Sequence, residues 1–188
     1  MRITIASLLL AAISHSISAV CGMAIPSEAS VEVRSANTCA DPTKTELYFE
    51  GYSPSSTAHV LQRLFAFVST DTVTHGDWQV QGQVVFQAWS MPQEFTVPLW
   101  AMYNPTTIDY SYVIATDGTT PSVAGLQALG PVAYVYATQV CGSIPLFALA
   151  QGTEGDHWYT TVETERDGFV SLGWVNEGIV AFVLPVNS

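Results

Sequence analysis

Hydrophobic and polar residues alternate in short runs along most of the chain, and the pattern is clearest near its C-terminal end. Residues 144–150 are apolar on both faces, 157–162 are aromatic and β-branched, and 174–184 alternate again. Gly and polar residues between these runs are typical of turns. A capping pattern at 160–163 predicts a short helix that ends before Gly173. This segment therefore predicts a strand, a turn, a second strand, a short helix and a third strand.

A similar segment occurs three times, at a spacing of about 48 residues, which is a period typical of repeat architectures. The ending of the segment recurs at 178–182, 130–134 and 82–86. Its opening recurs at 144–148, 97–101 and, more weakly, 45–49. In this alignment Leu146 corresponds to Leu99 and to Leu47.

The repeat predicts one mostly β domain over residues 45–188. Its three units are 45–95, 96–143 and 144–188. One such unit cannot bury its apolar face alone, so we expect the three to close around a shared axis. The simplest closed form is a β-trefoil-like, pseudo-threefold barrel with short helical turns, which also removes exposed sheet edges. A β-prism or a three-bladed arrangement would satisfy the same repeat.

The N-terminal residues 1–24 have the composition of a secretory signal peptide. Arg2 precedes an apolar run that is too short to span a bilayer, which needs about 20 residues. Cleavage after Ala24 is favoured over an earlier site near Ser18. Residues 25–44 lack a sustained period and are predicted to be an extended arm. We therefore expect a secreted, extracellular protein.

The three cysteines support the later cleavage site. Removal of Cys21 with the leader would leave Cys39 and Cys141, an even number for an oxidising compartment. The sequence therefore predicts a disulfide bond between Cys39 and Cys141.

The chain is strongly acidic, with a formal net charge of −11 from 5 Lys and Arg and 16 Asp and Glu. Binding to nucleic acid or anionic lipid needs clustered cations, which this chain lacks, so we expect neither partner. The uncharged stretch at 128–150 is interrupted by Gly and Pro, which argues against a membrane span. The predicted form is a monomeric, water-soluble domain.

The residues Gly155-Asp156-His157-Trp158-Tyr159-Thr160-Thr161, followed by Gly173-Trp174 and Glu177-Gly178-Ile179, resemble a known family. Its units carry G-D-H-F-Y-T-T and G-W-x-Y-E-G-I, and the similarity extends over 45–185. The family is a secreted repeat family of unknown function, found as free-standing fungal proteins and as an accessory module on bacterial hydrolases. The resemblance implies secretion, the repeat and an accessory binding role, and it implies no reaction chemistry.

The sequence gives little evidence for a catalytic site. Neighbours in a strand point to opposite faces, so Asp156 and His157 are not expected to converge, and they are interpreted as residues that hold the turn and the hairpin. No Ser lies in a nucleophile elbow, and the His residues have no metal-ligand spacing. We therefore predict a protein that is not an enzyme and has no cofactor and no metal site.

A binding role is better supported, because flat aromatic faces stack on sugars and carboxylates accept hydrogen bonds from their hydroxyls. Trp158 is not matched by a Trp in either other unit, so we expect an exposed stacking residue. The predicted glycan-binding site consists of Asp156, Trp158, Tyr159 and Glu154. The alternative is a protein-binding factor, such as a protease inhibitor or a host-directed effector, that acts through the exposed loop at 116–121.

Overall fold

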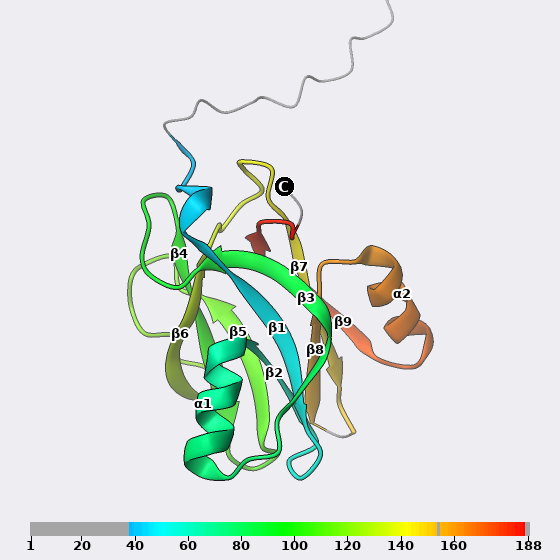
Figure 1. Cartoon of the computed structure of the whole chain (residues 1–188). Helices are drawn as coiled ribbons and strands as arrows, with labels where there is room; N and C mark the ends of the chain where they lie inside the picture. The colour runs from blue at the N-terminus through cyan, green and yellow to red at the C-terminus, as the bar shows by residue number, and fades with distance from the viewer. Residues whose placement is uncertain (1–37, 154, 187–188) are drawn as a thin grey trace, which may run out of the picture. The chain divides into compact units, whose positions relative to one another are not determined.

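The computed structural model describes residues 38–153 and 155–186 (Figure 1). The predicted signal peptide, most of the predicted arm and Glu154 lie outside the described residues. Within these ranges the fold is mostly β, with nine strands, two α-helices and a short 3-10 helix, η2 (Pro42–Lys44). No helix in the described ranges is both long enough and apolar enough to cross a membrane.

The strands fall into three sets that follow one another in the sequence. The first set is β1 (Thr45–Ser53), β2 (Ala58–Arg63) and β3 (Gln79–Trp89). The second set is β4 (Val97–Asn104), β5 (Asp109–Ile114) and β6 (Gln127–Val135). The third set is β7 (Ile144–Gln151), β8 (Asp156–Thr160) and β9 (Val175–Val183). Helices α1 (Leu64–Thr74) and α2 (Glu163–Ser171) precede the last strand of the first and third sets.

Every set has the same connectivity, because its first strand pairs antiparallel with both its second and its third strand. The first two sets join into a six-stranded sheet of order β2-β1-β3-β6-β4-β5, and the third forms a sheet of order β8-β7-β9 (Figure 1). The predicted closed barrel is therefore not found among the described strands. Among the described residues, backbone strand pairing between the sets is limited to single bridges, which are too short to continue one sheet around an axis.

The three sets have corresponding registers, but not the register that the sequence alignment gave. Leu99 pairs with Ala133 and Leu146 pairs with Ala181, and each pair is followed by a one-residue bulge on the last strand. The matching pair in the first set is Tyr48 with Phe86. Tyr48, and not Leu47, therefore corresponds to Leu99, and the alignment of the first unit was wrong by one residue. A shift of one residue exchanges the two faces of a strand, so it changes which side chains are buried.

The main core lies where the three sets meet and contains matching residues from each. Its buried members are Tyr48, Leu61, Phe86, Ala88, Leu99, Ala101, Tyr112, Ala133, Val135, Leu146, Ala148, Tyr159, Ala181 and Val183. The last strands of the sets also touch in turn, through the bridges Trp89 to Tyr134, Tyr136 to Phe182 and Gln87 to Leu184. Each set consequently contacts both of the others at one end of this core.

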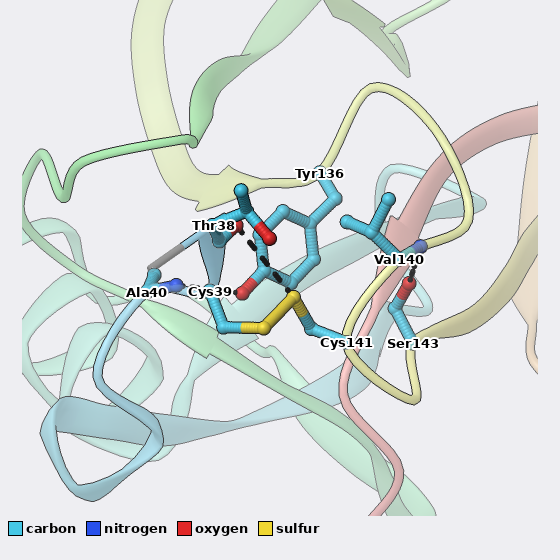
Figure 2. The surroundings of a disulfide bond; sticks show 7 residues. All are labelled: Thr38, Cys39, Ala40, Tyr136, Val140, Cys141 and Ser143. Carbon is cyan, nitrogen blue, oxygen red and sulfur yellow. Dashed lines mark hydrogen bonds between the residues drawn. A yellow bond between two sulfur atoms is a disulfide. The ribbon is translucent and has the colours of Figure 1, made fainter. Parts of the chain in front are cut away.

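The predicted disulfide bond between Cys39 and Cys141 is present and ties the segment before β1 to the loop before β7 (Figure 2). Ala40 is buried in a second cluster with Trp89, Tyr136 and Leu184. The backbone N–H of Ala40 donates to the Tyr136 hydroxyl at 2.9 Å. The Trp89 indole N–H donates to the backbone carbonyl of Asp41 at 2.7 Å. The segment before β1 therefore covers the end of the core where the three sets touch.

The predicted helix in the third unit is confirmed as α2, but its predicted cap is wrong. The N-cap residue is Val162, which makes no side-chain capping bond, and the Thr160 hydroxyl accepts from the backbone N–H of Val162 instead. The first unit also has a helix, α1, which extends over 11 residues. The second unit has no helix between its described strands β5 and β6.

Candidate functional site

Two histidines join neighbouring strand sets by bonding to aspartates from a different set. On β2, His59 Nδ1 lies 2.7 Å from Asp156 Oδ2, and the His59 backbone N–H donates to Asp156 Oδ1 at 3.0 Å. On β8, His157 Nδ1 lies 2.8 Å from Asp109 Oδ2. His59 and His157 occupy the same register position in their sets, since they pair with Tyr52 and Ala150 on the first strands. The Asp-His dipeptide of the third set therefore holds the sets together.

The charge around His157 changes its pKa. Burial lowers the pKa of the imidazole, but the hydrogen bond and charge of Asp109 and the charges of Glu177 and Asp156 raise it by more, so the net shift is upward. Glu177 Oε2 also lies 3.3 Å from His157 Nε2. His157 was expected to hold its own hairpin, but its ring bonds to Asp109 of another strand set and lies against Glu177 of its own set.

A second inter-set contact uses tyrosine hydroxyls. The backbone N–H of Tyr112 donates to the Tyr159 hydroxyl at 3.2 Å. The backbone N–H of Leu61 donates to the Tyr112 hydroxyl at 2.8 Å, and that hydroxyl lies 3.2 Å from the Leu61 carbonyl oxygen, to which it donates. These bonds link the third set to the second set and the second set to the first. Burial raises the pKa of the Tyr112 and Tyr159 hydroxyl groups.

Glu50 occupies the place where this series of contacts is incomplete. Tyr112 faces Ala101 and Tyr159 faces Ala148 across their hairpins, whereas the matching pair in the first set is Leu61 and Glu50. Leu61 has no hydroxyl group that could bond to a neighbouring set, and its side chain is smaller than that of tyrosine. The longer Glu50 side chain therefore replaces the small alanine at this position, beside Tyr159.

The Glu50 carboxyl group has an environment that disfavours its charge. The residue is 1% exposed, and neither carboxylate oxygen has a hydrogen-bond partner in the part of the chain that the structure describes. Burial raises its pKa well above the ordinary value of 4.5, and the charges of Asp156 and Glu165 raise it further. The Tyr159 backbone N–H opposes the shift, but it lies outside good hydrogen-bonding geometry.

Trp158 lies at the same inter-set boundary. Its ring stacks on Phe169 of α2 with centroids 5.0 Å apart, and it meets the His59 ring edge to face at 5.0 Å. Trp158 is half-buried, so the expectation of a freely exposed stacking residue is wrong. Its indole nitrogen is buried and has no partner among the described residues. Helix α2 packs over the Trp158 ring. The sequence predicted this helix but not the face of the sheet that it covers.

Glu50 and Trp158 line one pocket, which we call the Glu50 pocket. It has a volume of about 330 Å³ and is lined by Glu50, residues 81–85 of β3, Trp158, Tyr159, Thr161, Val162 and Glu165. Glu165 is exposed whereas Glu50 is buried, so the pocket extends from the surface at α2 toward the core. Its walls come from the first and third sets, which are distant in sequence.

The predicted glycan site is only partly brought together by the structure. Trp158 and Tyr159 line the Glu50 pocket, whereas Asp156 is 7% exposed and is bonded to His59, and Glu154 lies outside the described residues. Glu50 and Glu165 were missed as site residues. The available signal for Glu50 was a carboxylate between the aromatic residues Phe49 and Tyr52 of β1, but the one-residue alignment error concealed that it matches two alanines.

Other candidate sites carry less chemistry. No group of three or more His, Cys, Asp or Glu that could hold a metal ion occurs in residues 38–153 and 155–186. The loop at 116–121 is largely exposed and is braced by Asp117, whose carboxylate accepts from the backbone N–H and the hydroxyl of Thr119. A further hollow of about 330 Å³ adjoins this loop and has no buried charged group in its lining.

Comparison with protein families finds one match. Residues 47–184 match the model of a family described as a domain of unknown function, DUF5648. Searches against curated proteins and against solved structures find no match.

Proposed function

Because the chain belongs to the DUF5648 family of domains of unknown function, we propose its role from its own geometry: a secreted, non-enzymatic protein that binds carbohydrate in the Glu50 pocket. The observation that carries the proposal is a pocket lined by two residues whose buried polar groups have no partner among the described residues, the Glu50 carboxyl group and the Trp158 indole N–H. A buried polar group without a partner is costly, and a ligand rich in hydroxyl groups would supply both a donor and an acceptor.

The composition of the pocket wall also favours a sugar. Trp158, Val84, Val85 and Val162 give apolar surface, while Glu165, Gln81 and Gln83 give polar groups toward the exposed end. Sugars have apolar faces and polar edges, and sites that recognise them combine apolar walls with a few placed polar groups. The proposed site therefore shares Trp158 and Tyr159 with the site predicted from the sequence. Its carboxyl groups are those of Glu50 and Glu165 instead of that of Asp156.

Secretion is part of the proposal. The leader-like residues 1–24 motivate it, and a disulfide bond is typical of oxidising compartments. We further propose that the three strand sets derive from an internal repeat with a trefoil-like, approximately threefold arrangement. The corresponding registers and the three bridges that join the last strands in turn support it.

A glycan array with the purified, disulfide-bonded protein tests the proposal. We expect binding to a restricted set of glycans, and we expect Glu165→Gln to weaken it. Glu163→Gln is the matched control, because Glu163 is exposed on the same helix but does not line the pocket. Binding to no glycan, or equal binding by the parent and by Glu165→Gln, would contradict the proposal.

The rival function is protein binding through the loop at 116–121. Its exposure and the bracing by Asp117 favour it, because inhibitory loops are presented in a fixed conformation. The two functions separate cleanly in one comparison. Thr119→Ala should leave glycan binding unchanged, whereas it should weaken the binding of a protein partner that docks on this loop.

A further inference from the structure

We propose that the Glu50 pocket selects an amino sugar, whose protonated amine binds beside Glu50 and Glu165. This inference rests on the proposed glycan-binding function and specifies the ligand class. Both carboxyl groups line the same pocket, one buried and one exposed. In the part of the chain that the structure describes, no Lys, Arg or His lines this pocket.

The charges around the pocket favour a cationic ligand and oppose an acidic one. The charges of Asp156 and Glu165 both act on Glu50, so the field at its carboxyl group is negative. The chain as a whole has a formal net charge of −11. A sugar with a carboxylate or sulfate would meet repulsion, whereas a protonated amine would be attracted to the same position.

Glu50 also lacks the bond that an amine would supply. Neither of its oxygens has a hydrogen-bond partner among the described residues. An ammonium group has three donors and no acceptor, so it satisfies a carboxylate without adding an unpaired acceptor. An ammonium group bound there favours the ionised form of Glu50 and so opposes the upward shift of its pKa in the empty pocket. An N-acetyl group in the same place brings no positive charge and leaves that environment unchanged.

The pocket suits an organic ammonium better than a metal ion. Trp158, Val84, Val85 and Val162 line it, and such apolar walls pack against carbon atoms. Hard divalent cations need six or more oxygen ligands, whereas this pocket offers two carboxyl groups.

The test compares oligomers of β-1,4-linked glucosamine and of N-acetylglucosamine, of the same length, by isothermal titration calorimetry at mildly acidic pH. We expect the amine oligomer to bind at least about ten-fold more tightly, as for other desolvated charge pairs. Binding should weaken with added salt, because salt screens the exposed carboxylate.

Two variants locate the effect. Glu50→Gln should lose at least about ten-fold in affinity for the amine oligomer. Glu165→Gln, at the exposed end, should lose about two- to five-fold. Glu163→Gln removes the same charge from an exposed position outside the pocket and should bind like the parent. Thermal melting of each variant confirms that it is folded.

The outcomes separate this inference from the proposed function. Equal binding of both oligomers, or preference for the N-acetylated one, overturns the amine selection and leaves glycan binding in place. Binding of neither oligomer overturns the amine selection, and glycan binding is then decided by the array. Calcium chloride is titrated in the same calorimetric experiment. Tight binding of calcium ions that Glu50→Gln abolishes would assign the pocket to a metal and overturn the inference.

Discussion

At the residue scale, Glu50 is a position where the first strand set departs from the other two. Its carboxyl group replaces a small alanine beside a leucine that replaces a tyrosine. The substitution fills space near Tyr159, but it buries an acid that has no hydrogen-bond partner within the described residues. Replacing such a group with a neutral one of the same shape should stabilise the fold.

We therefore predict that Glu50→Gln is more stable than the parent at neutral pH, because the amide has no charged form to desolvate. The pKa of Glu50 is raised in the folded state, so the folded protein holds this proton at pH values where the unfolded chain has lost it. The parent's stability from this group is highest below pH 4.5 and falls as pH rises toward the folded-state pKa. Urea unfolding across this range checks it. A parent and variant with parallel pH profiles would contradict the assignment.

At the element scale, contacts between different strand sets position the hairpins. Tyr112 on β5 bonds through its hydroxyl to both backbone groups of Leu61 on β2. Tyr159 on β8 bonds in turn to the backbone of Tyr112. These bonds fix β2, β5 and β8 beside one another although each belongs to a different set.

Loss of the Tyr112 hydroxyl should leave the Leu61 N–H and carbonyl unpaired in the core. We expect Tyr112→Phe to cost about 1–3 kcal/mol of unfolding free energy. The control is Tyr103→Phe on β4, whose ring packs on Tyr110 and whose hydroxyl bonds to none of the described residues. Chemical denaturation of both variants measures the difference. Equal stability of the two would show that the hydroxyl contact is unimportant.

The sequence predicted the strands and helices better than the contacts between the strand sets. Alternation and Gly placement located the third set and α2. Gly82, Gly130 and Gly178, which open the recurring ends of the three units, have positive φ angles of 68°, 143° and 100° respectively. His59 and Asp156, 97 residues apart, could not be paired from sequence, because that contact depends on how the sets pack. Glu50 was missed because the first unit was aligned one residue out of register, and β3 has one more unpaired residue than β6 and β9.

At the scale of the whole molecule, the disulfide bond holds the segment before β1 over the end of the core. Cys39 and Cys141 are separated by 102 residues, and Ala40 next to Cys39 is buried against Trp89 and Tyr136. The bond therefore constrains nearly the whole domain, and its loss should release a segment that shields an apolar cluster.

We predict that the paired substitution Cys39→Ser and Cys141→Ser lowers stability by about 4–5 kcal/mol, the chain-entropy value for a loop of this length. Thermal and urea unfolding measure the loss. Intact mass after alkylation without reduction provides the covalent check, because the native protein should take up no alkyl group. Uptake of two groups by the folded protein would contradict the bond.

The most direct test of the central claim, that ligand binds in the Glu50 pocket, is the NMR signal of the Trp158 indole N–H. The chain has 5 Trp residues, so the indole signals can be assigned with single Trp→Phe variants. Trp100 is an internal control, because its indole nitrogen is also buried without a partner among the described residues but does not line the pocket. Titration with the glucosamine oligomer should shift the Trp158 signal and leave the Trp100 signal in place. Saturable binding that leaves the Trp158 signal unmoved would contradict the claim.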